Sequence, residues 1–305
     1  MREALTFRLY AVGWRLVRAL PEATAHRLFQ QLADVLWRRR GTGVRQLEAN
    51  LLRAAPGSSL LELRALTRAG MRGYLRYWCD TFRLPDWDHE RVVDRVRVIG
   101  EEHLRANTGP GQRGVVAALM HMGNWDHAGA WASLTGVSVS TVAERLRPER
   151  LFDRFLAHRE SLGMEILPLT GGEGQLLEAL GHRLRQGWLV PLLADRDLSG
   201  TGVPVTMLGE AARLPAGPAM LALRTGAALH PLSIWHEHTE SGRPGIVLEF
   251  LPEVAVPRVS VGRTRARLEL MTQQVADAFG AAITAHADDW HMLQPVWTAD
   301  HGRSR

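Results

Sequence analysis

The chain has 305 residues, of which 46% are hydrophobic and 23% charged, ordinary proportions for a globular protein with a sizeable core. Its single cysteine, Cys79, excludes an intramolecular disulfide and a cysteine-rich zinc site, and fits a reducing compartment. The aromatic neighbours of Cys79 favour a buried, inert thiol over a nucleophile. No uninterrupted apolar run of about 18 residues occurs, so the sequence predicts no transmembrane helix.

The charge balance is basic, with 37 Lys+Arg against 32 Asp+Glu and a net charge of +5. Every one of these basic residues is an arginine, whose guanidinium binds phosphates in a bidentate fork. Anionic partners such as lipid headgroups or coenzyme phosphates are therefore admissible. The arginines are spread along the chain and no DNA- or RNA-binding motif occurs, so we expect no nucleic-acid partner.

The first 95 residues are predicted to be almost wholly helical. The expected helices are 2–20, 22–40, 43–54, 59–70 and 70–83, of which the last two form either one helix or two. The segment 2–20 has an apolar stripe with aromatic residues on one flank and arginines on the other. Such a helix either lies in a membrane interface or packs on its own domain. Its arginines interrupt any signal-peptide core.

From about residue 96, short apolar runs alternate with helical patterns. The predicted strands are 114–119, 137–143, 164–169, 188–194, 227–235 and 245–251. The predicted helices are 125–134, 148–162, 173–186, 216–225 and 261–286. This alternation predicts an α/β fold with a mainly parallel central sheet flanked by helices. Without a linker, we expect one domain over 1–305, in which a helical, membrane-associating part (1–95) is built onto an α/β catalytic core (96–305).

The stretch MHMGNWDHAG, residues 120–129, follows one of these buried strands. Ligands in open α/β sheets bind beyond the carboxyl ends of strands, which is where His121 falls. Gly123 permits a tight bend and Asn124 is a good N-cap, so Asp126 lies in the first turn of the next helix. We expect Asp126 to hydrogen-bond one nitrogen of His121 and leave the other free to take a proton. Because the sequence contains no G-x-S-x-G elbow, this pair suits a base acting on the hydroxyl of a substrate.

Two other interpretations of this stretch remain open. In the first, His121 has no chemical role and is only a structural residue of the N-capped turn. A metal site is the second, built from His121, Asp126 and His127 or drawing on His236–Glu237–His238, although neither group has the spacing of a zinc protease.

Several ordered blocks resemble one enzyme family. The sequence HMGNWD, residues 121–126, resembles the H-x4-D motif of glycerolipid and lipid A acyltransferases, in the H-x-G-N-W-D form of the lipid A biosynthesis acyltransferase family. Further blocks are similar to the actinobacterial branch that acylates phosphatidylinositol mannosides: residues 141–155, 159–173, 194–222 and 288–297. Together with AVGWRLVRALPE near the start, the resemblance covers nearly the whole chain.

The resemblance implies roles for particular residues. His121 would be the general base and Asp126 the residue that orients it. Arg145, with Glu144 beside it, is expected to bind phosphate of the acceptor or the coenzyme, and Arg196 is a further phosphate-binding candidate. Either Asp195 or Glu210 would be a second acidic residue near the pair; the sequence does not separate these two candidates.

The implied activity is direct transfer of a palmitoyl group from acyl-CoA to a mannose 6-hydroxyl of a phosphatidylinositol mannoside. Acyl-CoA is a co-substrate, and no cofactor or metal is expected. The implied location is the cytoplasmic face of the plasma membrane, as a peripheral protein. The alternatives are a lipid A-type transferase with a glucosamine-based acceptor and a non-catalytic basic protein that binds membrane surfaces.

Overall fold

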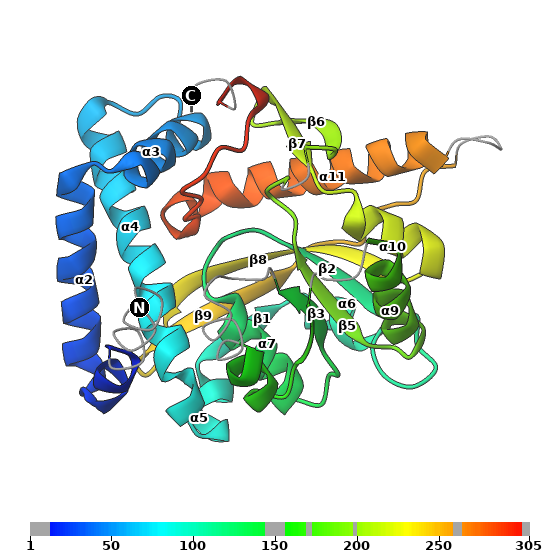
Figure 1. Ribbon diagram of the computed structural model, residues 1–305, viewed down its shortest axis with the longest axis horizontal. Helices are drawn as coiled ribbons and strands as arrows, with labels where there is room; N and C mark the ends of the chain where they lie inside the picture. The colour runs from blue at the N-terminus through cyan, green and yellow to red at the C-terminus, as the bar shows by residue number, and fades with distance from the viewer. Residues whose placement is uncertain (1–12, 144–155, 169–172, 198–199, 259–263, 301–305) are drawn as a thin grey trace, which may run out of the picture.

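The computed structural model describes residues 13–143, 156–168, 173–197, 200–258 and 264–300 (Figure 1). A helical N-terminal part stands beside a mixed α/β core, as the sequence predicts. Its helices are α2 (Glu22–Arg39), α3 (Thr42–Ala54) and α4 (Leu60–Arg83), preceded by helical residues at 13–19. The short η1 (Leu84–Asp86) and α5 (His89–Asp94) lead into the sheet. In the described residues, no helix is long and apolar enough to cross a membrane.

Helix α4 is continuous through the glycines at which a break was considered. Ser59 caps its start, because the Ser59 hydroxyl accepts from the Glu62 amide and the Glu62 carboxylate accepts from the Ser59 amide. A Cβ at Gly73 would lie 3.0 Å from the carbonyl oxygen of Asp288. Glycine is therefore used here to let the C-terminal segment approach the helix closely, and not to end the helix.

The central sheet has five strands in the order β1-β9-β8-β2-β5. Their bounds are β1 (Val96–Ile99), β2 (Val115–Leu119), β5 (Leu189–Leu193), β8 (Ala228–His238) and β9 (Pro244–Phe250). Only the β8–β9 pair is antiparallel, and the other three pairs are parallel. The predicted α/β fold with a mainly parallel sheet is therefore confirmed.

Two small sheets extend this core. The parallel pair β3 (Ser140–Ala143) and β4 (Glu165–Pro168) adjoins β5 through a bridge between Val139 and Leu189. The antiparallel hairpin β6 (Val203–Met207) and β7 (Glu210–Leu214) lies against α11 (Thr264–Ala285). The hairpin, β1, α5 and α6 (Glu101–Arg105) were not predicted, whereas each predicted strand has its counterpart in the structure.

Both faces of the sheet are buried, and alternate residues of β2 show it. Val116 and Ala118 belong to the core shared with α11, α9 (Glu173–Arg185), α10 (Gly217–Thr225) and the N-terminal helices. Val115 and Ala117 belong to the core under α5, α6 and α7 (Trp125–Leu134). Figure 1 shows α11 above the sheet and α5 and α7 below it. Burial on both faces explains why β2 reads as a continuous apolar run.

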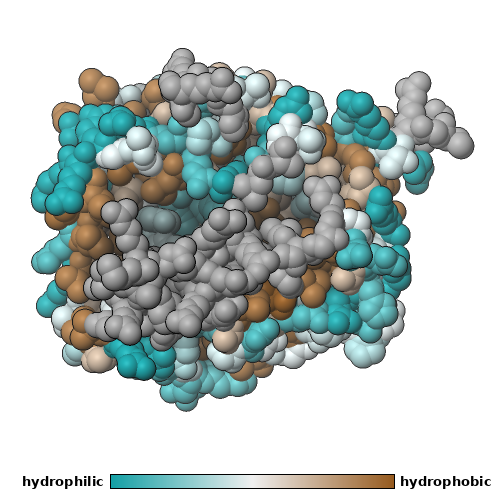
Figure 2. All heavy atoms as spheres, viewed as in Figure 1, coloured by the Kyte–Doolittle hydropathy of each residue, from teal (hydrophilic) through white to brown (hydrophobic). Residues whose placement is uncertain are grey.

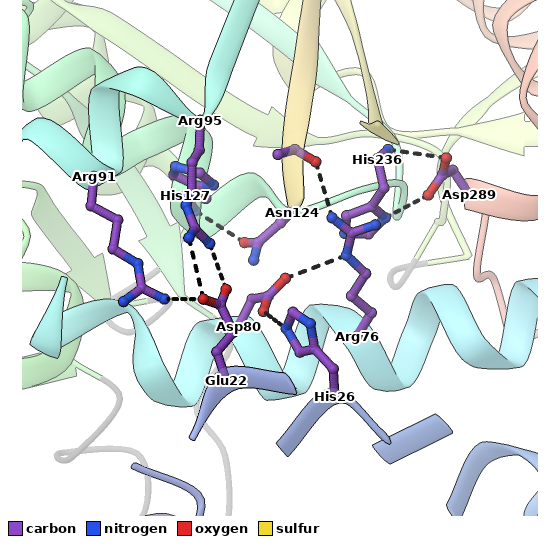
Figure 3. Close-up of polar contacts among 11 residues, drawn as sticks. Glu22, His26, Arg76, Asp80, Arg91, Arg95, Asn124, His127, His236 and Asp289 are labelled. Carbon is purple, nitrogen blue, oxygen red and sulfur yellow. Dashed lines mark hydrogen bonds and ion pairs between the residues drawn. The ribbon is translucent and has the colours of Figure 1, made fainter. Parts of the chain in front are cut away.

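A buried polar network joins the N-terminal helices to the sheet (Figure 3). Asp80 of α4 accepts from His26 of α2 at 2.6 Å and lies 3.5 Å from the guanidinium of Arg76. Arg76 also donates to the backbone carbonyl of Gly245, at the start of β9. Cys79, next to Asp80, is fully buried, as expected of an inert thiol.

The contribution of this network to protein stability depends on pH. Burial alone would raise the pKa of Asp80, but the hydrogen bond from His26 and the charges of His26 and Arg76 lower it to about 2, from 3.8. A lowered folded-state pKa adds stability that is present above pH 3.8 and is lost as the pH falls towards about 2.

Asp80→Asn is expected to cost about 3 kcal/mol at neutral pH, because it leaves the half-buried guanidinium of Arg76 without its carboxylate partner and weakens the hydrogen bond with His26. It should also flatten the decline of the unfolding free energy below pH 4, since the titrating group is gone. Urea unfolding across this pH range measures both effects, with the exposed Asp94→Asn as control. An equally steep decline in Asp80→Asn and wild type would contradict the assignment.

Candidate active site

The site begins where two neighbouring parallel strands end. Strands β2 and β5 pair with Leu119 opposite Leu193, and the Ala194 amide continues the pairing by donating to the Leu119 carbonyl. His121 and Asp195 each come two residues after these partners. The register of the sheet therefore brings the imidazole and the carboxylate together at its carboxyl edge.

Asp195 holds His121 at two points. The Asp195 Oδ2 atom accepts from the His121 backbone amide at 2.8 Å, and Oδ1 lies 2.7 Å from His121 Nδ1. Burial alone would raise the pKa of Asp195, but the charge of His121 and the hydrogen bonds to the carboxylate lower it. An ionised carboxylate on Nδ1 selects the tautomer with the proton on that nitrogen, which leaves Nε2 as a base.

The predicted hydrogen bond between His121 and Asp126 is wrong. Asp126 is buried in the first turn of α7, and its carboxylate accepts from Arg159 Nε at 2.6 Å and from the Tyr77 hydroxyl at 2.9 Å. Burial would raise the pKa of Asp126, but Arg159 lowers it. The two side chains that hydrogen-bond Asp126 come from α4 and from the helical residues before β4. The ring next to His121 is instead that of Trp125, which packs edge-on against the imidazole with 5.6 Å between ring centres.

The loop between β2 and α7 has the geometry that the sequence predicts. Gly123 has a φ of +58°, and a Cβ there would lie 2.5 Å from the carbonyl oxygen of Ile234 in β8. The Asn124 side chain caps α7 by accepting from the His127 amide at 3.0 Å. These two residues let the chain turn sharply so that His121 faces outward from the strand end.

The structure distinguishes between Asp195 and Glu210, the two candidates for a second acidic residue near His121. Glu210 lies on β7 with its side chain 47% exposed, pairs with Arg53 at 2.8 Å, and is not beside His121. The expectation that Glu210 lies near His121 is therefore wrong. Glu210 forms an ion pair at the surface, because the hairpin that carries it packs on α11 and not at the sheet edge. Of the phosphate-binding candidates, Arg196 lines the same cavity as His121, whereas Glu144 and Arg145 lie outside the described residues.

The histidines considered as metal ligands have other partners. His127 is fully enclosed, with Nε2 2.8 Å from the Val92 carbonyl, and burial lowers its pKa to about 4. The His236 Nδ1 atom lies 2.6 Å from Asp289 Oδ1. Both histidines therefore serve the packing of the loop and sheet instead of converging with His121.

A cavity of about 490 Å³ opens in front of His121. Apolar side chains from three helices line much of it: Trp131 and Ala132 of α7, Leu176 and Leu180 of α9, and Met220 and Leu221 of α10. The polar side chains of His121, Asp126, Arg159 and Arg196 are gathered at the same cavity. Its volume is within the range of about 300–1,000 Å³ typical of ligand pockets. The arrangement suits a base that borders a space for an apolar group.

Sequence reasoning missed four residues that shape the site. Tyr77 and Arg159 hold Asp126, while Trp290 Nε1 donates to Asp195 Oδ2 at 3.0 Å. His291 donates its backbone amide to the His121 carbonyl at 3.0 Å, and burial and the charge of His121 lower the pKa of the His291 ring to about 3. Arg159, Trp290 and His291 lie in blocks that carried the family resemblance, which was the one available signal.

Comparison with known proteins identifies a family and relatives of similar sequence. Residues 1–299 match the profile of the bacterial lipid A biosynthesis acyltransferase family. The chain is 45% identical over 291 residues to a phosphatidylinositol mannoside acyltransferase of Mycolicibacterium smegmatis, which covers 95% of this chain and 91% of that protein. It is 44% identical over 298 residues to the protein of the same name from Mycobacterium tuberculosis, which covers 97% and 90% respectively.

Gly123→Ala tests the close approach of the loop to β8. Both this variant and Gly136→Ala place alanine at a positive φ, but no atom lies within 4 Å of the Cβ position at Gly136. Gly123→Ala should therefore lower the free energy of unfolding by about 1–3 kcal/mol more than Gly136→Ala, because of the clash with Ile234. Denaturant unfolding measures the difference, and equal losses would mean that the approach is not constrained.

Proposed function

Since the chain belongs to the bacterial lipid A biosynthesis acyltransferase family and is an O-acyltransferase, we propose that it moves a long-chain acyl group from acyl-CoA to a mannose 6-hydroxyl of a phosphatidylinositol mannoside. The acceptor class is proposed from the names of the relatives at 44–45% identity. The observation that carries the chemistry is His121, held by Asp195 in the lining of a largely apolar cavity.

The proposed reaction needs no covalent enzyme intermediate. The Nε2 atom of His121 takes the proton of the mannose hydroxyl as its oxygen attacks the thioester carbonyl. The new carbon–oxygen bond forms, the carbon–sulfur bond breaks, and the proton passes from His121 to the departing thiolate of CoA. Asp195 stabilises the imidazolium that exists between these two proton transfers. Asp126 supports the site through Arg159 and Tyr77.

The lining of the cavity supports this proposal for both substrates. A palmitoyl tail fits the chemistry of its apolar lining, and the guanidinium of Arg196 at the same cavity suits a phosphate. We retain Glu144 and Arg145 as proposed acceptor- or coenzyme-binding residues. Holding two large amphiphiles in a reactive arrangement would supply much of the lowering of the barrier.

We further propose that the protein acts as a peripheral protein on the cytoplasmic face of the plasma membrane. Leu28, Leu32 and Val35 recur along one side of α2 and are 38–49% exposed. Figure 2 shows apolar atoms in brown at the left margin, where Figure 1 places α2. In the described part of the N-terminal helix, Trp14 and Val17 are packed but Leu16 is 61% exposed. This side is suited to contact with lipid.

The first test measures CoA thiol release from palmitoyl-CoA with and without phosphatidylinositol mannosides. We expect acceptor-dependent release by the wild type, and a loss of roughly 10²–10⁴-fold in His121→Ala because the general base is removed. Replacing the acceptor with a glucosamine-based glycolipid should give little release. Release without any acceptor would indicate thioester hydrolysis, and no release at any acyl length would favour a binding protein.

Replacing each of three acidic residues with its amide tests which carboxylate acts on His121; the first two variants are compared directly. Asp195→Asn should lower kcat by roughly 10³–10⁴-fold, because an amide cannot hold the required tautomer. Glu210→Gln should retain wild-type kcat, since Glu210 lies in a surface ion pair. A large loss in Glu210→Gln with little loss in Asp195→Asn would reverse the assignment.

Asp126→Asn has a different expected signature. It should reduce thermal stability as well as activity, because Arg159 is then left largely buried beside an uncharged amide. Calorimetric unfolding beside the kinetic measurement tests whether the loss of activity in Asp126→Asn is accompanied by a loss of stability. Equal stability of Asp126→Asn and wild type would contradict a supporting role through Arg159.

A further inference from the structure

The segment after α11 returns to the catalytic loop and pairs with it. Its short helix η2 (Ala287–Asp289) is followed by Trp290, which bridges Met122 in antiparallel fashion. The Gly123 amide donates to the Asp289 carbonyl at 3.1 Å, and the His291 amide donates to the His121 carbonyl at 3.0 Å. The backbone on both sides of Trp290 is therefore fixed to the loop that carries His121.

The indole of Trp290 reaches past this backbone pairing to the carboxylate itself. Its Nε1 donates to Asp195 Oδ2 at 3.0 Å, and the same oxygen accepts from the His121 backbone amide at 2.8 Å. The other oxygen, Oδ1, faces His121 Nδ1 at 2.7 Å. Both Trp290 and Asp195 are fully buried, so water does not replace a missing donor.

Two donors on one carboxylate oxygen fix the plane of the group. Without the indole, the carboxylate would be held by His121 alone, through its backbone amide and Nδ1, and no donor from outside that residue would fix its plane against rotation about the Cβ–Cγ bond. We infer that Trp290 is a positioning residue of the transfer reaction: its indole N–H locks Asp195 in the orientation that holds His121 as a base. This inference rests on the proposed function.

Loss of the indole N–H also changes the charge that His121 experiences. The Asp195 carboxylate would carry a less neutralised negative charge, which stabilises the protonated imidazole and extends the inactive form to higher pH. The charged and titratable groups near this pair include His291 from the C-terminal segment, on which His236 and Asp289 also act, Asp126 of α7 with Arg159, and Arg196 and Asp197 after β5. None of these groups is altered by a substitution at Trp290.

The chain offers a matched control. Trp297 is also fully buried, packs edge-on against Trp290 at 6.0 Å, and donates its Nε1 to the backbone carbonyl of Met207 at 3.0 Å. Trp297→Phe therefore removes a buried indole hydrogen bond of the same length from the same region, but without touching Asp195. Any effect of lost packing alone should appear in both variants.

The experiment compares wild type, Trp290→Phe and Trp297→Phe in the palmitoyl-CoA and phosphatidylinositol mannoside assay from about pH 5 to 9, with thermal unfolding of each protein. Trp290→Phe should lower kcat by roughly tenfold to a hundredfold with KM nearly unchanged, because a hydrogen bond to a charged group is lost. The acidic limb of its pH–activity profile should move to higher pH. Trp297→Phe should lose comparable thermal stability with kcat and profile unchanged.

Equal kcat and identical pH profiles in the two tryptophan variants would overturn the inference while leaving the proposed function intact. An inactive wild type would instead count against the proposed function. If Trp290→Phe does not fold, replacing the indole of Trp290 with benzothiophene removes the N–H and retains the shape. In either form, the effect should disappear when it is measured in Asp195→Asn, since Trp290 acts through that carboxylate. An undiminished effect there would also overturn the inference.

Discussion

The site depends on the burial of one charged carboxylate. A buried carboxylate is costly unless hydrogen bonds and a nearby positive charge compensate for its lost water. Asp195 meets this condition only where the ends of β2 and β5 and the C-terminal segment meet, because its donors come from His121 and Trp290. Folding of the core therefore fixes the imidazole of His121 before any substrate arrives, which is the preorganisation that the proposed general-base role would require.

A second buried carboxylate, Asp126, has separate partners. Arg159 and Tyr77 satisfy it, and burial followed by the charge of Asp126 raises the pKa of Tyr77, so the hydroxyl stays protonated and can donate. Tyr77 belongs to α4 and also stacks near Trp125 at 4.1 Å between ring centres. The two residues of the H-x4-D motif thus face different neighbours: one is held by the sheet edge, and the other ties α7 to the N-terminal helices.

The sequence was sufficient to predict the local features of this region but not the pairing. The apolar run of β2, the bend at Gly123 and the cap at Asn124 each depend on neighbouring residues, and all three are present. The choice between Asp195 and Glu210 depended on strand register, which joins residues more than 70 positions apart. The contact expected between His121 and Asp126 was wrong because closeness along the chain did not reveal the competing Arg159.

The missed hairpin shows a related limit. Strands β6 and β7 are joined by Leu208 and Gly209, both at positive φ, a turn in which the first position usually carries asparagine, aspartate or glycine. Leu208 gives no such turn signal, and its side chain instead lies against Gly280 of α11. Tertiary packing therefore overrides the local preference, and it also carries Glu210 away from the sheet edge.

The loop that carries His121 is held between parts of the chain that are far apart in sequence. Asn50 of α3 is fully buried and donates to the carbonyls of Met292 and Gln294, just beyond the residues that pair with the loop. Gly73 of α4 allows Asp288 to approach closely from the same segment. The N-terminal helices therefore support the C-terminal segment, which in turn supports His121 and Asp195. Polar groups buried between these parts pair with one another, so the C-terminal segment links the loop that carries His121 to the N-terminal helices.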